Sequence, residues 1–266
     1  MTPVTVQAGT GPVVLGLPHT GTFVPDDLAR DLNDNGRKLA DTDWHIDRLY
    51  AGLLPDATRV TANFHRYVID ANRDPAGDSL YPGQNTTSLV PLSDFDGAAI
   101  WDRLPTEADI ARRRTTFHAA YHAALGAELA RVRGLHGIAI LYDCHSIRSD
   151  IPFLFEGTLP DFNIGTNSGV TCALEIEAAI MRICNAAAGY SCTLNGRFKG
   201  GWTTRHYAQP DKAIHTIQME LAQSAYLTAQ AAPWAYDPGK AARIRPHLTS
   251  ILTALADLAP ILRGTS

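Results

Sequence analysis

The stretch GIAILYDCHS at residues 137–146 runs from apolar residues into polar side chains that can bind metal. The apolar part predicts a buried strand from Gly137 to Tyr142, and His145 follows where we expect that strand to stop. A second apolar run, PVVLGL at residues 12–17, leads in the same way to His19. Open α/β sheets bind ligands at the carboxyl ends of their strands, and neutral imidazole is the commonest metal ligand. The two histidines therefore predict a metal site at one rim of a sheet.

Outward from these two runs, strand-like and helical patterns alternate along the chain. The alternation predicts an α/β fold with a largely parallel sheet and helices on both of its faces, in one domain over residues 1–266. Two long irregular stretches, 72–91 and 146–169, are expected to shape a pocket. The predicted strands are 13–17, 59–62, 137–142, 192–194 and 215–221, and the predicted helices are 26–32, 43–53, 107–133, 172–187 and 240–262.

The composition is that of an ordinary globular protein, with 266 residues, 45% hydrophobic and 19% charged. The apolar runs are shorter than a membrane span needs, and a net charge of −4 gives no general attraction to nucleic acid. We therefore expect neither membrane nor nucleic acid as a partner, and focal binding of any small anion. The four cysteines lack a metal-ligand spacing, and the N-terminal residues do not resemble a signal peptide, so we expect a cytoplasmic protein.

A third metal ligand is needed, because a catalytic zinc usually takes three protein ligands and leaves a position for water. The segment DTDWHID at residues 41–47 offers Asp41, Asp43 and Asp47 at the start of a predicted helix. Each of these could instead cap the helix or lie at the surface. The pattern does not select one of the three.

Glu220 lies in the strand-like run IHTIQMEL at residues 214–221, among mostly apolar neighbours. Burial of a carboxylate without a partner is costly. Beside a metal-bound water such a group is suited to take the proton and pass it to a leaving nitrogen. The alternatives are an ion pair with a structural arginine or a place on an exposed face.

Two donor-rich segments follow predicted strands. Residues 63–75 contain Arg66, Asn72 and Arg73, and residues 195–207 contain Arg197 and Arg205. Arginine matches a carboxylate with two parallel hydrogen bonds, and asparagine adds a donor, so an acidic small-molecule substrate fits. A guanidinium near the metal could also stabilise a developing oxyanion. The alternative is ordinary pairing with the acidic residues Asp74, Asp161 and Asp211.

Taken together, these segments resemble the N-formylglutamate amidohydrolase (N-formylglutamate deformylase) family from about Val13 to Tyr226. The resemblance implies a relation to zinc carboxypeptidases and aspartoacylases, and hence a three-layer α/β/α sandwich with a mixed central sheet. The segments that carry it are PHTG (18–21), 41–50, NRDP (72–75), DCHS (143–146), LPDFNIGT (159–166), TRHY (204–207) and QME (218–220).

The resemblance also assigns roles to residues. It implies that His19 and His145 bind zinc, or another divalent ion, and that Glu220 activates water. Arg66 would polarise the scissile carbonyl. The remaining implied roles concern the substrate carboxylates, with Asn72 and Arg73 holding the α-carboxylate and Arg197 or Arg205 the γ-carboxylate.

The chain departs from the wider superfamily at one ligand. There a glutamate follows the first histidine at an offset of three residues, whereas here that position is Thr22, which cannot replace a carboxylate. Asp43 is our choice for the third ligand, because an aspartate at the start of the following helix recurs in sequences similar to this family. Asp41 and Asp47 stay open as alternatives.

The activity implied is hydrolysis of N-formyl-L-glutamate to formate and L-glutamate, a late step of histidine breakdown. One rival is a deacylase of another N-acyl acidic amino acid, such as N-formylaspartate or an N-acylglutamate. A second is a cysteine hydrolase that uses Cys144. A third is a non-catalytic protein that binds acidic metabolites beside a vestigial metal site. The sequence does not indicate an oligomeric state.

Overall fold

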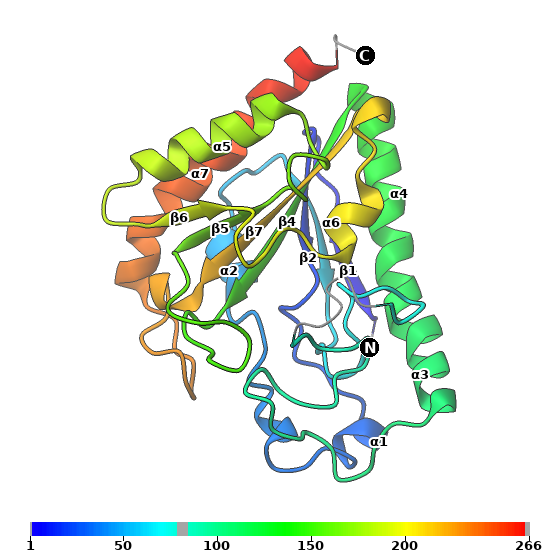
Figure 1. Cartoon of the computed structure of the whole chain (residues 1–266). Coiled ribbons are helices and arrows are strands. Elements are labelled where there is room, and N and C mark those ends of the chain that lie inside the picture. Colours follow the sequence, from blue (N-terminus) through cyan, green and yellow to red (C-terminus); the bar gives the residue numbers. More distant parts are fainter. Residues whose placement is uncertain (1, 79–84, 264–266) are drawn as a thin grey trace.

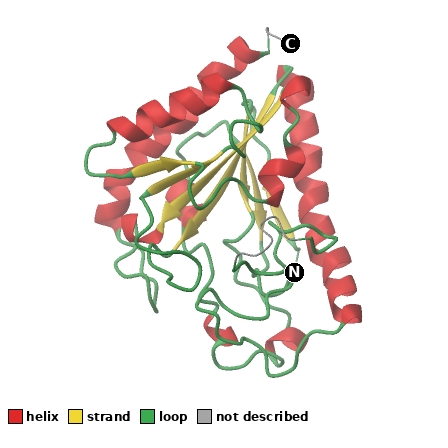
Figure 2. Ribbon diagram, in the orientation of Figure 1, coloured by secondary structure: helices red, strands yellow, loops and turns green. Residues whose placement is uncertain are grey.

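The computed structural model describes residues 2–78 and 85–263. Within these residues the centre of the fold is a seven-stranded sheet with the order β1-β3-β2-β4-β7-β5-β6 (Figures 1 and 2). Strands β3, β2, β4 and β7 are parallel, whereas β1 is antiparallel to β3 and β5 is antiparallel to β7. The sheet is therefore mixed and largely parallel, as predicted. Its strands are β1 (Val4–Gln7), β2 (Val13–Leu17), β3 (Thr58–Ala62), β4 (Ala139–Ile147), β5 (Phe162–Gly165), β6 (Cys192–Leu194) and β7 (Ile214–Ala222).

Helices cover both faces of the sheet, which confirms the predicted layers (Figure 1). One face carries α4, with α3 before it and the short α6 beside it, and the other carries α2, α5 and α7. The bounds are α1 (Asp26–Ala29), α2 (Ile46–Tyr50), α3 (Glu107–Arg113), α4 (Ala119–His136), α5 (Leu174–Ala186), α6 (Trp202–Tyr207) and α7 (Pro238–Leu262), with a π-helical turn at Arg114–His118 and 3₁₀ turns at Gly36–Lys38, Pro210–Lys212 and Gln223–Ala225.

Strand β4 is buried along its whole length and divides its side chains between the two faces. Ile140 and Tyr142 pack in the apolar cluster under α5 and α7, whereas Leu141 packs in the cluster under α4. Because side chains alternate along a strand, His145 projects to the same side as Leu141. His145 and the hydrophobic cluster under α5 and α7 therefore lie on opposite faces of the sheet.

The prediction that the β4 strand stops at Tyr142 is wrong, because the strand continues to Ile147. Beyond Asp143 the strand has lost its neighbour β2 but stays paired with β7 as far as Ala222. His145 thus lies inside a strand, near its carboxyl end. The backbone hydrogen bonds to β7 fix the backbone that carries the ring.

Other differences concern short elements. The edge strand β1 and the four-residue strand β5 were not predicted, and β5 lies within the stretch 146–169 that we expected to be irregular. The predicted helix 43–53 begins only at Ile46, because His45 adopts a left-handed backbone with φ of 60°. Part of the other irregular stretch, residues 79–84, lies outside the described residues. None of the helices that the structure describes is long and apolar enough to cross a membrane.

Candidate active site

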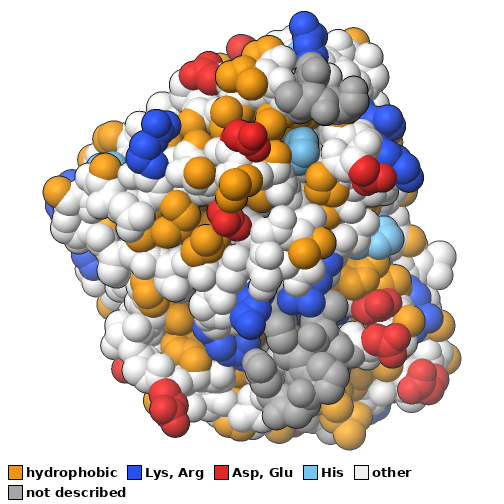
Figure 3. All heavy atoms as spheres, turned by 45° about the horizontal axis from the view of Figure 1, so that its top comes forward, with side chains coloured by type: hydrophobic (Ala, Val, Ile, Leu, Met, Phe, Trp, Pro, Cys, Tyr) orange, Lys and Arg blue, Asp and Glu red, His pale blue; other side chains and the backbone are white. Residues whose placement is uncertain are grey.

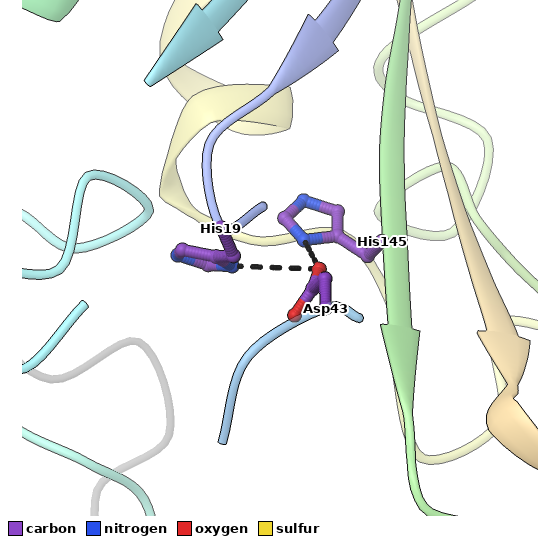
Figure 4. Close-up of side chains that lie close together, drawn as sticks. All are labelled: His19, Asp43 and His145. Atoms are coloured by element: carbon purple, nitrogen blue, oxygen red, sulfur yellow. Dashed lines mark ion pairs between the residues drawn. The ribbon is translucent and has the colours of Figure 1, made fainter. Parts of the chain in front are cut away.

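Three side chains from separate segments meet at the carboxyl end of the parallel strands. His19 follows β2, Asp43 lies in the turn before α2, and His145 lies in β4 (Figure 4). The Asp43 Oδ2 atom is 3.8 Å from His19 Nδ1 and 3.3 Å from His145 Nδ1. One ligand atom from each residue lies within 4.8 Å of the other two, and all three residues are buried. The fold thus brings together the three residues that were predicted as metal ligands from separate parts of the sequence.

The donor set fits a divalent metal ion. Two imidazole nitrogens and one carboxylate oxygen are ligands that zinc accepts, and a fourth position is left for water. The His19 Nδ1 atom is buried without a hydrogen-bond partner, which is costly unless another group binds it. A cation among these three atoms would satisfy that nitrogen.

Each ring is oriented by a second carboxylate on its far side. His19 Nε2 lies 2.8 Å from Asp70 Oδ1, and His145 Nε2 lies 3.0 Å from Asp143 Oδ2. A ring that donates its Nε2 hydrogen to a carboxylate keeps the Nδ1 lone pair for a metal. Neither aspartate was predicted from the sequence as part of the site. Asp143 could have been found, because residues two apart in a strand share a face.

The electrostatics of the cluster favour positive charge at its centre. Burial lowers the pKa of His145, but the Asp143 and Asp43 carboxylates outweigh it and hold that pKa well above its usual value. Burial raises the pKa of Asp43, and the Arg66 guanidinium, whose Nη2 is 3.0 Å from Oδ1, brings it below its ordinary value. The carboxylates that hold a proton on His145 would equally attract a metal ion in its place.

Glu220 faces the same centre from the neighbouring strand. It is the register partner of His145 across β4 and β7, so both side chains project from one face of the sheet. Glu220 is buried, and its Oε2 accepts a hydrogen bond of 3.1 Å from Gln218. Burial raises the pKa of Glu220 from 4.5 to about 8, so the group can exchange a proton near neutral pH. Because Glu220 is buried, the alternative that it lies on an exposed strand face is wrong.

The two histidines and Glu220 border a cavity of about 260 Å³. Its wall includes Arg66, Asn72, Arg73 and Arg197 together with His19, His145 and Glu220. Arg73 is held by Thr87, whose carbonyl and hydroxyl oxygens each lie 2.8 Å from the guanidinium. Of the residues considered from the sequence, Arg205 is not among those that line the cavity, and its Nε donates to the Gly200 carbonyl at 2.9 Å.

The cavity wall is partly apolar, and basic side chains gather on the surface of the protein. Phe95, Leu154 and Phe198, which belong to a small hydrophobic cluster, line the cavity together with the polar groups. On the face seen in Figure 3, lysine and arginine side chains lie close together near the middle, while acidic side chains are scattered. A net charge of −4 therefore coexists with a local basic region, which suits focal binding of an anion.

The other candidates from the sequence have different surroundings. Asp41 accepts hydrogen bonds from the Tyr67 hydroxyl and the Phe95 amide, and burial raises its pKa to about 7. Asp47 lies in the first turn of α2. Neither joins the group of metal-capable side chains. Cys144 points into the apolar cluster under α5 and α7, and burial raises its pKa well above the usual value, so the thiol is placed for packing rather than for attack.

Comparison with solved structures shows the same fold in other proteins. A crystal structure of N-formylglutamate amidohydrolase from Ralstonia eutropha matches with a TM-score of 0.79 and 25% identity, covering 100% of both chains. A protein of Agrobacterium tumefaciens matches with a TM-score of 0.72 over 97% of this chain and 96% of that one, at 19% identity. The second likeness concerns the fold alone.

Comparison of sequences gives closer relatives. The N-formylglutamate deformylases of Pseudomonas aeruginosa and Pseudomonas putida are 42% and 41% identical to this chain. The alignments cover 94% of both chains for the first and 93% of both for the second. Residues 11–227 match the profile of the family described as N-formylglutamate amidohydrolase, which confirms the resemblance noted in the sequence. The chain belongs to the N-formylglutamate amidohydrolase family.

Proposed function

We propose that this protein hydrolyses N-formyl-L-glutamate to formate and L-glutamate, with one zinc ion or a similar divalent ion held by His19, Asp43 and His145. The family and the names of the Pseudomonas relatives support the reaction. The observation that carries the mechanism is the convergence of these three ligand atoms next to a cavity that His19, His145 and Glu220 line. A cluster of this kind is suited to the hydrolysis of a small amide.

The proposed chemistry is addition of water to the formyl carbon and cleavage of its bond to nitrogen. A bound divalent ion would lower the pKa of a water molecule and polarise the formyl oxygen. Glu220 accepts a proton from the attacking water and returns it to the leaving nitrogen, so the amine departs uncharged. Its buried position, beside His145 on the neighbouring strand, supports this role, because desolvation brings its pKa near neutrality.

The cationic side chains of the cavity are proposed to bind the carboxylates of the substrate and to stabilise the negative charge of the transition state. Arg66 is buried next to the metal-ligand set and would offset charge that develops on the formyl oxygen. Asn72 and Arg73 would hold the α-carboxylate. Arg197 suits the γ-carboxylate better than Arg205 does, because Arg197 lines the cavity. This assignment makes an acidic N-formyl amino acid the fitting substrate.

The test combines metal analysis with formate release. Freshly purified protein should contain about one divalent ion per chain, lose activity with a chelator and regain it with zinc. Initial rates on N-formyl-, N-acetyl- and N-succinyl-L-glutamate should fall as the acyl group grows. Activity that survives complete metal removal would refute the metal mechanism, and faster turnover of the larger acyl groups would replace the formyl assignment with a general deacylase.

The proposal includes a place for the reaction in the cell. We assign it to histidine degradation, which the family resemblance implies, and place it in the cytoplasm, which the four free cysteines support, since thiols persist in a reducing compartment. A strain without the gene should accumulate N-formyl-L-glutamate when grown on histidine. Normal formate release from histidine in that strain would contradict the assignment.

A further inference from the structure

Two histidines of the helical segment that covers the site hold the backbone on both sides of Asn72. His118 and His122 are four residues apart, so they lie on one helix face with a rise of about 6 Å. His118 Nε2 is 3.0 Å from the Arg73 carbonyl oxygen, and His122 Nε2 is 2.8 Å from that of Ala71. Because a carbonyl oxygen only accepts, both Nε2 atoms carry the hydrogen and donate it.

The surroundings of the two rings select this form. Burial lowers the pKa of His122 to about 3 and also lowers the pKa of His118, so both rings are neutral at physiological pH. The Tyr207 hydroxyl donates to the His122 carbonyl oxygen at 3.0 Å and lies 3.1 Å from the remaining ring nitrogen. The Trp202 ring packs against both imidazoles, with centroid distances of 5.6 Å and 4.8 Å. Helices α4 and α6 thus fix the rings jointly.

The side chain of Asn72 is held as firmly as its backbone. Its backbone amide donates to Asp70 Oδ1 at 2.8 Å, and its own Oδ1 accepts from the Thr203 amide at 2.9 Å. Asn72 and Arg73 line the cavity, whereas His118 and His122 do not. The two histidines therefore act on the cavity wall indirectly, through the short segment that they hold and through Trp202, the neighbour of the cavity-lining Gly201.

We propose that His118 and His122 are positioning residues, which fix the segment Ala71–Arg73 so that its side chains can grip the α-carboxylate of the substrate. The inference rests on the proposed function, which assigns Asn72 and Arg73 to that carboxylate.

Loss of one imidazole leaves a buried carbonyl oxygen without its hydrogen-bond donor, which is costly. We expect the segment Ala71–Arg73 to shift so that this oxygen can accept another hydrogen bond. Asn72 also contacts Asp70 and lies 3.2 Å from His145 Nε2 through its Nδ2, but the three metal ligands lie outside the segment and keep their contacts with one another. We therefore expect the larger loss in recognition of the carboxylate.

The experiment compares two substrates in two variants. N-formyl-L-glutamate carries the α-carboxylate, and its α-carboxamide, N-formyl-L-isoglutamine, lacks that charge. His122→Phe keeps a ring without a donor and should lower kcat/KM for the carboxylate substrate about 10- to 100-fold, with little change for the carboxamide. His122→Gln places an amide donor near the same carbonyl and should restore most of the loss. Zinc content should be unchanged in both.

His136→Phe is the matched control, because it makes the same substitution in the last turn of α4, away from the cavity. It should leave the ratio of kcat/KM for the two substrates unchanged. Equal losses on both substrates in His122→Phe, or a Gln variant as impaired as the Phe variant, would overturn the positioning role. If His122→Phe does not fold, His118→Phe and His118→Gln give the same comparison. Wild-type protein that releases formate from neither substrate would instead refute the proposed function itself.

Discussion

Replacement of Glu220 by glutamine should remove most of the activity and at the same time stabilise the metal-free protein. The amide has nearly the shape of the carboxylate and can keep the contact with Gln218, but it cannot accept the proton of water. A general base contributes about 10²- to 10⁴-fold, so the barrier should rise by about 2.7 to 5.5 kcal/mol. Substrate affinity and zinc content should change little.

The stability gain follows from the cost of burying the charge. The folded protein raises the pKa of Glu220 from 4.5 to about 8, so it binds this proton more tightly than the unfolded chain does. The wild-type free energy of unfolding should therefore fall as pH rises from about 4.5 to about 8, by up to about 5 kcal/mol from this group. The Glu220→Gln variant has no carboxylate at this position, so its free energy of unfolding does not fall in this way. The difference in the free energy of unfolding between variant and wild type should be small near pH 4.5 and largest at pH 8 and above.

Two measurements check this prediction. A coupled formate assay on zinc-loaded protein gives kcat, and urea unfolding of metal-free protein at about pH 5 and about pH 8 gives the stability difference. Glu175→Gln, at an exposed position in the first turn of α5, is the control and should change neither. A variant within threefold of the wild-type rate would refute the role of Glu220 as base. A stability difference that does not vary with pH would refute the reasoning from burial.

Three further substitutions test the surroundings of the site. Asp143→Asn should weaken zinc binding about 10- to 100-fold in a chelator competition, because the His145 ring loses its charged partner, and unchanged affinity would contradict this. Gly201→Ala should raise KM with full zinc content, because a Cβ would lie 2.3 Å from Asn72 Nδ2, and a normal KM would count against the binding role of Asn72. Cys144→Ser should lose about 1 to 3 kcal/mol of stability by burying a hydroxyl, but keep its turnover. Loss of turnover with zinc retained would favour the thiol mechanism instead.

The long, buried parts of the fold could be predicted from the sequence, and the short parts could not. Strand β2 and the first part of β4, Ala139–Tyr142, are continuous apolar runs, which is typical of central strands covered on both faces. Strand β5 has four residues and exists because it pairs with β7, so its own pattern carries little signal. The late start of α2 depends on the left-handed backbone of His45, a conformation that local propensity does not favour.

The candidate site was predictable where a polar residue interrupts an apolar run, as at His145 and Glu220. Asp43 required the family resemblance, because Asp41 and Asp47 carry the same chemistry at nearly the same place. The contacts of Asp70 with His19 and of His118 and His122 with the backbone join distant segments, and no local pattern announces such contacts. Sequence pattern shows which residues can act, whereas only the tertiary structure shows which atoms meet.

The register of β4 against β7 has a consequence for how this enzyme can change over evolution. A single inserted residue in either strand would turn every following side chain to the opposite face. After such an insertion in β7, Glu220 would point into the hydrophobic cluster under α5 and α7. Met219 or Leu221 would then lie beside His145. Insertions and deletions should therefore accumulate in the surface loops and be absent from β4 and β7. In these two strands a shift of one residue would disrupt both the packing of the core and the arrangement of the catalytic residues.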